Sequence, residues 1–199
     1  KKAVVEKLRA AHRVKQLPES GSLFRIEIAL LEDRATLTLD TSGAGLHKRG
    51  YRTLSGATPL KETLAAGMLS LTFWRRERPL LDPFCGTGTI PIEAALIGRN
   101  LAPGLNRDFA AESWPRMPAA QWEAARQEAR DLIQPPLAIR IIGNDISPRV
   151  LQLARQHAEA AGIAEEIHFQ QTRGFDVIHR PLGNDVRLTG NLCQRHIVG

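Results

Sequence analysis

The start of the chain carries apolar residues first at the period of a helix and then at the period of a strand. Over residues 3–13, Val4, Leu8 and Ala11 recur every three or four positions, which predicts an amphipathic helix. Residues 23–40 hold two stretches that alternate apolar with mostly polar side chains around a short charged run, which predicts a half-buried antiparallel hairpin. One helix and one hairpin are too few elements for an independent domain, so we expect them to complete a domain begun upstream.

Farther along, short apolar runs alternate with longer helical patterns. The expected elements are a helix over 59–74, a strand over 79–82, a helix over 89–98, a strand over 138–142, a helix over 147–161 and a strand over 166–170. Strands that alternate with helices predict a parallel sheet with right-handed crossovers, and hence an α/β fold. In the first of these helices, Thr58 stands at the N-cap position, Pro59 at the first position and Glu62 near the positive end.

Two irregular stretches interrupt this order. The insertion 99–137 is long for a connection, and within it residues 119–133 predict a further helix whose apolar face is formed by Trp122, Ala125, Ala129 and Ile133. Residues 42–52 are basic and rich in glycine, which is typical of an interdomain linker. We therefore expect a first domain over 1–45, a linker over 46–58 and a second domain over 59–199.

The composition is that of an ordinary globular protein, with 43% apolar and 24% charged residues over 199 positions. No apolar run reaches the roughly 18 to 20 residues that cross a bilayer, and the first residues lack the apolar core of a secretory signal. We therefore expect a cytoplasmic protein with no membrane partner. Cys85 and Cys193 are far apart and lack CxxC spacing, so we expect neither a disulfide framework nor a metal site.

The net charge of +6 is concentrated near the N-terminus. Residues 1–60 hold 11 Lys and Arg against 6 Asp and Glu, which leaves +5, whereas residues 61–199 hold 16 against 15, which leaves +1. If the partner is a polyanion such as RNA, it would therefore meet the N-terminal segment. Alternatively, the excess charge only forms a basic face exposed to solvent. The candidates for contact with RNA phosphates or bases are Lys48, Arg49, Tyr51 and Arg52. Alternatively, residues 47–52 fasten the linker to the second domain through packing of Tyr51 and ion pairs.

The strongest functional signal is the turn Asp82-Pro83-Phe84-Cys85-Gly86-Thr87-Gly88-Thr89, which joins an expected strand to an expected helix. Gly86 and Gly88 would let the backbone approach a nucleotide-like ligand, and the helix N-terminus would offer oriented N–H groups. A dinucleotide fingerprint would have a third glycine where Pro91 stands. Asp82 would repel a pyrophosphate but attract the ammonium of a methionine moiety, which favours S-adenosylmethionine over NAD. Cys85 is interpreted as a small filler rather than a nucleophile.

A second acid, Asp145, follows the expected strand over 138–142. A carboxylate at this place can bond both ribose hydroxyls of a cofactor. It lies about sixty residues past the glycine turn rather than the roughly twenty of a dinucleotide fold, and the long insertion accounts for the difference. Alternatively, Asp145 only shapes the turn before Ser147, which is placed to cap the next helix.

Several separate motifs, in order, resemble the THUMP-containing guanine-N2 RNA methyltransferases, and among them the bacterial enzymes that modify large-subunit rRNA. The resemblance is carried by Leu46-His47-Lys48-Arg49-Gly50-Tyr51-Arg52, by residues 59–65, by residues 81–95, by residues 100–107 with Trp114, and by Gly143-Asn144-Asp145-Ile146. It covers roughly residues 3–170 and implies a Rossmann-like methyltransferase domain preceded by the α+β end of a THUMP RNA-binding domain over 1–45. The implied activity is methylation of a guanine N2 amine in 23S rRNA.

The resemblance also implies a site for the cofactor S-adenosylmethionine. Residues 82–89 would hold its methionine end, Asp145 and Ile146 its ribose side, and Asp176, the only acid in the zone after the third strand, its adenine amine. In the family, the guanine amine is oriented by Asn-Pro-Pro followed by an aromatic residue. That signature is absent from the 199 residues, so we name no catalytic residue, and residues 177–199 resemble no motif that we can place.

Three alternatives follow from these features. The missing signature fits an incomplete sheet, in which case the chain alone binds RNA or cofactor without catalysis. An adenine-N6 DNA methyltransferase would share the glycine turn, although the THUMP-like start favours RNA. An NAD-dependent oxidoreductase is disfavoured by Asp82 and Pro91.

Overall fold

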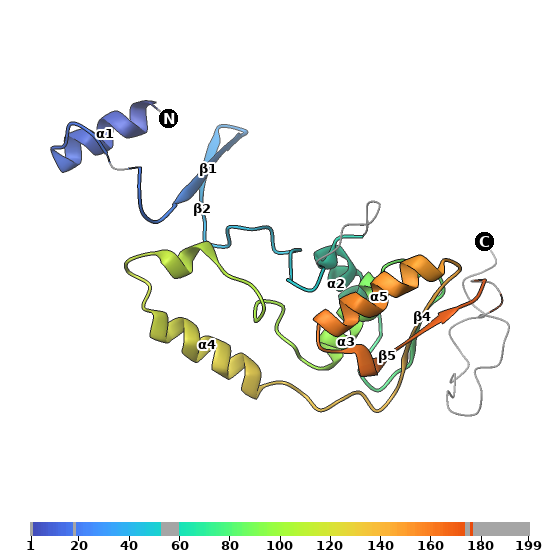
Figure 1. Ribbon diagram of the computed structural model, residues 1–199. Helices are drawn as coiled ribbons and strands as arrows, with labels where there is room; N and C mark the ends of the chain where they lie inside the picture. The colour runs from blue at the N-terminus through green and yellow to red at the C-terminus, as the bar shows by residue number, and fades with distance from the viewer. Residues whose placement is uncertain (1, 18, 53–59, 174–175, 177–199) are drawn as a thin grey trace. The chain divides into compact units, whose positions relative to one another are not determined.

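The computed structural model describes residues 2–17, 19–52, 60–173 and 176 (Figure 1). It divides into two compact units: the first holds Lys1–Gly43 and Phe109–Ala119, and the second holds Ala44–Asp108 and Ala120–Gly199. The expected helix cap at Thr58 and Pro59 lies outside the described residues, as do residues 177–199.

The first unit contains helix α1 (Lys2–His12) and the expected hairpin, formed by β1 (Arg25–Leu31) and β2 (Arg34–Asp40). The two strands pair antiparallel through a two-residue turn, in which Glu32 and Asp33 both adopt positive φ, of 47° and 59°. Positive φ at both central residues is the type I′ geometry that matches the twist of hairpin strands.

The expectation of a half-buried hairpin is wrong. All seven residues of β1 are exposed, and the cross-strand pair Ile28 and Leu37 is 61% and 68% exposed. A two-stranded ribbon has backbone partners but no third layer, so its apolar face has nothing within the ribbon to pack against.

A part of the long insertion belongs to the first unit rather than to the second region. The 3-10 helix η1 (Ala110–Ser113) lies next to the end of β2, because the backbone N–H of Ala111 donates to the carbonyl of Thr41, the residue that follows this strand. The ring of Trp114 stacks on Phe24 with centroids 4.7 Å apart, and its Nε1 donates to the carbonyl of Leu23. Aromatic stacking over this sequence distance has no periodic signature, so the pattern of residues did not reveal it.

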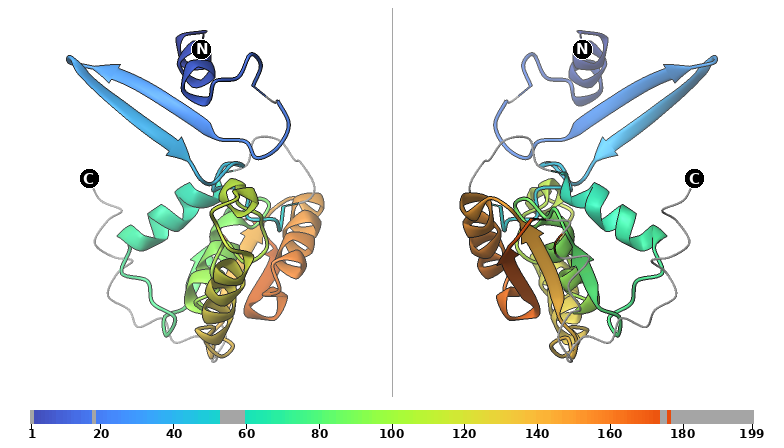
Figure 2. Two further views of the ribbon diagram at one scale, coloured as in Figure 1. Left: turned by 90° about the vertical axis from the view of Figure 1, so that its left-hand side faces the viewer. Right: turned by 90° about the vertical axis from the view of Figure 1, so that its right-hand side faces the viewer.

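The second unit is built on a parallel three-stranded sheet in the order β3-β4-β5, which confirms the expected α/β fold. The strands are β3 (Leu80–Asp82), β4 (Ile141–Asp145) and β5 (Ile167–Gln171), and β4 and β5 run side by side in the right view of Figure 2. The helices are α2 (Glu62–Leu71), α3 (Thr89–Gly98) and α5 (Pro148–Ala160), with the 3-10 helix η2 (Ala164–Glu166) before β5. Helix α3 contacts both α2 and α5.

The core of the second unit lies between these helices and the sheet. Its fully buried members come from α3, β4, α5 and the turn before η2, and they include Ile92, Ile141, Leu151 and Ile163. Because α3 is covered on several sides, eight of its ten residues are buried, including Glu93. This packing fixes the helix that begins at the glycine turn.

Several elements differ from the expectation in where they end or in which face is buried. Strand β4 extends through Asp145 instead of ending at residue 142, and α2 ends at Leu71 instead of residue 74 because Thr72 turns the backbone to an extended conformation. Helix α4 (Ala119–Asp131) forms as expected, but Ala125 is exposed, and its half-buried face is formed by Trp122, Arg126 and Ala129.

Candidate functional site

Two acids end neighbouring parallel strands at the same edge of the sheet. Asp82 is the last residue of β3 and pairs in register with Gly143, two residues before Asp145 at the end of β4. The turn over residues 83–88 leads from Asp82 into α3. The carboxyl ends of parallel strands are where α/β folds bind ligands, so both acids and the glycine turn face the expected binding edge.

The carboxylate of Asp145 joins the glycine turn to the turn that starts α5. Its Oδ2 accepts from the backbone N–H of Gly86 at 3.1 Å, and its Oδ1 accepts from the N–H of Ser147 at 2.9 Å. Ser147 caps α5, because its Oγ accepts from the N–H of Val150. Asp145 therefore has the local turn role that was left open as an alternative. A carboxylate offers about four acceptor positions, so these two bonds leave room for ribose hydroxyls.

Asp82 is placed where its negative charge is costly. Burial raises the pKa of its carboxyl above the ordinary value, the nearby charge of Asp145 raises the pKa further, and a hydrogen bond from the backbone N–H of Phe84 partly offsets both. Two acids in one partly buried edge are stabilised by a cation between or beside them. The charge pattern therefore fits a ligand that presents an ammonium group.

The two glycines of the turn have different roles, which corrects the expectation that both let a ligand approach. Gly86 has φ of +54°, and a Cβ added there would meet no atom within 4 Å, so its backbone faces open space. Gly88 has φ of +82°, but a Cβ there would come within 3.1 Å of Ala154 and Phe169. Gly86 leaves space for a ligand, whereas Gly88 lets α3 pack against α5 and β5.

Asn144 is a site residue that the sequence reasoning did not single out. It is fully buried in β4, and its Nδ2 donates to the carbonyl of Pro83 at 3.0 Å and to the carbonyl of Thr172 at 2.9 Å. The backbone carbonyl of Asn144 accepts from the backbone N–H of Cys85 at 2.7 Å. One side chain thus ties the residues that follow β3 to those that follow β5. The available signal was its place in the motif Gly143-Asn144-Asp145.

The thiol of Cys85 is buried beside both acids. Burial raises its pKa to about 12, and the charges of Asp82 and Asp145 contribute to the increase. The thiol therefore stays protonated at neutral pH, and a protonated thiol is a poor nucleophile. This agrees with the interpretation of Cys85 as a small filler.

The remaining predicted cofactor residues lie around the same edge. Phe84 and Ile146 are 62% and 64% exposed, next to Asp82 and Asp145 respectively. The carbonyl of Thr87 lies 3.3 Å from Nδ1 of His157, a buried residue of α5 that was not predicted. Asp176 is exposed, and its flanking residues lie outside the described part, so its contact with adenine stays a prediction.

The residues predicted to contact RNA are mostly engaged within the second unit. Arg49 pairs with the buried Glu93 at 3.0 Å, and the Tyr51 hydroxyl donates to the same carboxylate at 3.0 Å. Arg52 also points into the unit, and among the four residues Lys48 is the exposed one. This placement favours the alternative that the segment fastens to the second domain. Contact of these residues with RNA stays a prediction.

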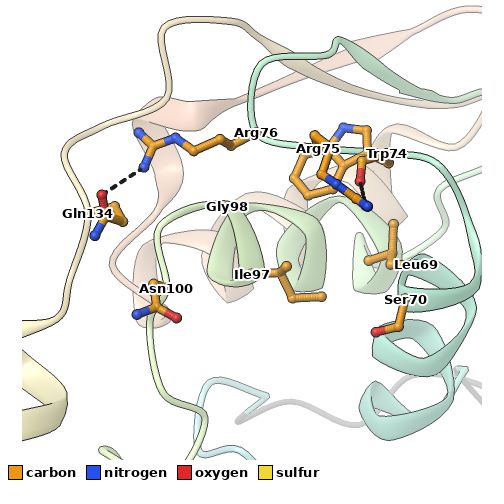
Figure 3. A pocket seen from close by; sticks show the side chains of 9 residues that line it. All are labelled: Leu69, Ser70, Trp74, Arg75, Arg76, Ile97, Gly98, Asn100 and Gln134. Carbon is orange, nitrogen blue, oxygen red and sulfur yellow. Dashed lines mark hydrogen bonds between the residues drawn. The ribbon is translucent and has the colours of Figure 1, made fainter.

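A separate cavity of about 360 Å³ lies at the other end of α3 (Figure 3). Trp74, Arg75 and Arg76 line one side of it, and Ile97 and Gly98, the last residues of α3, line another. Because the glycine turn leads into the first residue of α3, this cavity is not part of the candidate site. Arg76 reaches across to Gln134, with Nη1 3.3 Å from its Oε1.

The described residues form neither a membrane-spanning helix nor a metal-binding cluster. None of the helices there is both long and apolar enough to span a bilayer. The same residues hold no group of three or more His, Cys, Asp or Glu side chains that could bind a metal ion.

A family model and two similar curated proteins indicate the same methyltransferase family. A family model described as UPF0020, RMKL-like methyltransferase domain, matches residues 49–185. The match continues past residue 170, where the resemblance was expected to end, and includes residues 177–185. A Bacillus subtilis protein named as RNA methyltransferase YpsC is 48% identical over 178 residues, which cover 88% of this chain and 46% of that protein. The ribosomal RNA large subunit methyltransferase K/L of Shewanella frigidimarina is 40% identical over 159 residues, which cover 77% of this chain and 22% of that enzyme.

Solved structures agree on the fold. The methyltransferase SMU.472, complexed with SAH, is 42% identical with a TM-score of 0.81, over 88% of this chain and 46% of that one. A Listeria monocytogenes protein described as a predicted N6-adenine-specific DNA methylase is 51% identical with a TM-score of 0.80, over 86% of this chain and 46% of that one. The chain thus spans less than half the length of each of these relatives.

Proposed function

The chain belongs to the family of RMKL-like methyltransferase domains, and from this premise we propose that it binds S-adenosylmethionine for methylation of RNA. One observation carries the proposal. Asp82 and Asp145 lie at the same edge of the parallel sheet, next to Gly86, whose backbone faces open space. The structure of SMU.472 with SAH supports the same ligand class.

The residues of this edge fit the parts of the cofactor. Burial raises the pKa of the Asp82 carboxyl, and a methionine ammonium beside it would favour its charged form. The free space at Gly86 admits the ligand next to the backbone, and the unused acceptor positions of Asp145 suit the ribose hydroxyls. The cofactor supplies an activated methyl group, and the chain contributes binding and alignment.

RNA is the proposed substrate class, and a guanine N2 amine in 23S rRNA is the proposed target. The names of the Bacillus and Shewanella relatives support this choice, and so does the concentration of positive charge before residue 61. We propose in addition that residues 1–45 are the end of a THUMP RNA-binding domain. Its helix and hairpin expose apolar side chains such as Ile26 and Leu30, as a part of a larger domain would.

Adenine-N6 methylation of DNA is the second candidate. It is favoured by the description of the Listeria protein, which shares 51% identity with this chain. The two candidates use the same cofactor edge and differ in the base that receives the methyl group.

Calorimetric titration of the chain with SAH tests the cofactor site. Asp145→Ala is expected to weaken binding by about 1.5 to 3 kcal/mol, the scale of a lost hydrogen bond to a charged group. Glu159→Gln, which removes an exposed charge on α5, serves as the control and is expected to bind like the unmodified chain. Equal affinity of the Asp145→Ala variant and the unmodified chain would remove Asp145 from the site.

The substrate class is tested by incubation with methyl-labelled cofactor and either unmodified rRNA or duplex DNA, followed by digestion to nucleosides. Label in N2-methylguanosine supports the proposal, and label in N6-methyladenine from DNA supports the second candidate. Binding of SAH without transfer to either polymer is the outcome expected of a chain that lacks the Asn-Pro-Pro signature.

A further inference from the structure

Two arginines of one short segment contact two successive turns of α3. Arg52 reaches Thr89, the first residue of the helix, and Arg49 reaches Glu93, four residues later. Residues four apart lie above one another on the same face of a helix. The segment from residue 49 to residue 52 therefore lies along the beginning of the helix that the glycine turn leads into.

The guanidinium of Arg52 bridges two elements. Its Nη2 donates to Oγ1 of Thr89 at 2.6 Å, and its Nη1 lies 3.2 Å from Oε1 of Glu62 in α2. The side chains of Arg52 and Glu62 are only 16% and 4% exposed. The flat fork of an arginine can hold two acceptors in a fixed geometry, which a lysine cannot.

This pair is not explained by stability alone. Burying an ion pair costs desolvation energy that the attraction often fails to repay. Here the compensation is incomplete as well, because Nε of Arg52 and Oε2 of Glu62 are buried and have no hydrogen-bond partner within the described part of the chain. A costly pair at this place is better explained by the group that it holds, which is Thr89.

Thr89 directly follows the glycine turn, and the turn lacks a cap of its own there. Gly88 is the N-cap residue of α3 and has no side chain, so no side-chain cap hydrogen bond fixes the start of the helix. A further restraint near the end of the turn is His157, whose Nδ1 lies 3.3 Å from the carbonyl of Thr87. The end of the turn is thus held by side chains from outside it.

We propose that Arg52 is a positioning residue of the cofactor site: by bridging Thr89 and Glu62 it holds the glycine turn in the geometry that binds S-adenosylmethionine. The inference rests on the proposed function. It assigns the segment 49–52 to the cofactor site rather than to a free RNA-contacting linker. Arg49, one helical turn farther from the glycine turn, fastens the same segment without touching Thr89 and provides a matched control.

Hydrogen exchange of the unliganded chain is the first test, and it does not depend on cofactor binding. In the Arg52→Ala variant, the backbone amides of residues 86–90 are expected to exchange about tenfold faster, because a restraint on local opening is lost. In Arg49→Ala, exchange is expected to rise along the middle of α3 and to stay unchanged at the turn. Equal exchange of residues 86–90 in both variants and the unmodified chain would overturn the proposal.

Calorimetry with SAH is the second test. Arg52→Ala is expected to weaken binding roughly tenfold or more, the equivalent of one charge-assisted hydrogen bond, and Arg49→Ala less than about threefold. If the two variants weaken binding equally, the effect is a general loss of stability and the proposal fails. If the unmodified chain does not bind SAH, the proposed function fails, and the exchange result still decides whether Arg52 holds the turn.

Substitution at Thr89 gives a variant that keeps the shape of the core. Thr89→Val removes the acceptor but leaves the pair of Arg52 with Glu62, and Thr89→Ser keeps the acceptor. The exchange rates of Thr89→Val are expected to match those of Arg52→Ala, those of Thr89→Ser to match the unmodified chain, and the double variant Arg52→Ala/Thr89→Val to add little to either single change. Additive effects in the double variant would show that the two side chains act separately.

Discussion

The two units of the chain use similar apolar patterns with opposite results. In the second unit, residues such as Ile141 and Leu151 are almost fully buried between helices and sheet. In the first unit, the apolar residues of the hairpin are well formed into strands and yet exposed, and Leu30 is 79% exposed. The difference shows that an alternating pattern is sufficient to set strand pairing, whereas burial depends on a further layer that covers the strand.

The largest expected difference between the two units is in the free energy of unfolding after a leucine is replaced by alanine in each of them. Leu151→Ala in α5 should lower the free energy of unfolding of the second unit by about 2 to 5 kcal/mol, because it leaves a cavity in a packed core. Leu30→Ala in β1 should change stability by less than about 0.5 kcal/mol, because the side chain is already in water. Denaturant unfolding measures both, and a large cost at Leu30 would mean that the hairpin face is covered in solution.

One glycine in each unit gives a second comparison, with a smaller expected change in stability. Gly88 in the second unit and Gly21 in the first both have positive φ, +82° and +108°, so alanine is strained at either position. Only Gly88 is also confined, since an added Cβ there meets Ala154 and Phe169, whereas none of the described atoms lies within 4 Å at Gly21. Thermal unfolding should therefore show Gly88→Ala to cost about 1 to 3 kcal/mol more than Gly21→Ala. Equal costs would mean that the turn relaxes away from β5.

The smallest effect is the opposite response of two acids to pH. In the first unit, hydrogen bonds from the N–H groups of Gly43 and Ser42 lower the pKa of Asp40 below its ordinary 3.8, so the stability that it contributes is lost as pH falls through the lowered pKa. In the second unit, burial raises the pKa of Asp82 above 3.8, so its contribution to stability decreases as pH rises through the raised pKa.

Carbon-detected NMR titration of the side-chain carboxyl groups measures both pKa values. We expect the inflection of Asp40 below 3.8 and that of Asp82 above it. Added SAH should move only the Asp82 inflection, and should lower it, because an ammonium partner favours the charged carboxylate. Inflections in the reverse order would remove the distinction between the two carboxyl sites.

Helices and strands with a clear apolar period could be predicted from the sequence. The position of Asp82, Asp145 and the glycine turn at the ends of strands could be predicted as well. The residue at which β4 ends could not be predicted, because Asn144 and Asp145 are polar residues that normally indicate a turn. The place of Asn144 in a buried strand depends on acceptors such as the carbonyls of Pro83 and Thr172, and Asp145 accepts from the backbone N–H of Gly86; Pro83 and Gly86 lie far away in the sequence. A local pattern carries no information about such partners.

The basic segment before the second domain shows the same limitation. Arg49, Tyr51 and Arg52 have the composition of a surface that binds phosphate, and their acidic partners are Glu62 and Glu93. Glu62 was interpreted only as a favourable charge at the start of a helix, and Glu93 lies in a helix that reads as apolar. Whether a cation meets solvent or a buried acid is decided by tertiary packing, which the spacing of residues does not encode.

The long insertion between β3 and β4 also has a consequence for the time course of folding. The strands of the hairpin meet through a two-residue turn, and such hairpins form in roughly 1 to 10 μs. Leu80 of β3 pairs with Ile141 of β4, 61 positions along the chain, and contacts between distant residues form more slowly. The hairpin therefore forms early with its apolar face in water, and the edge that brings Asp82 to Asp145 is completed late.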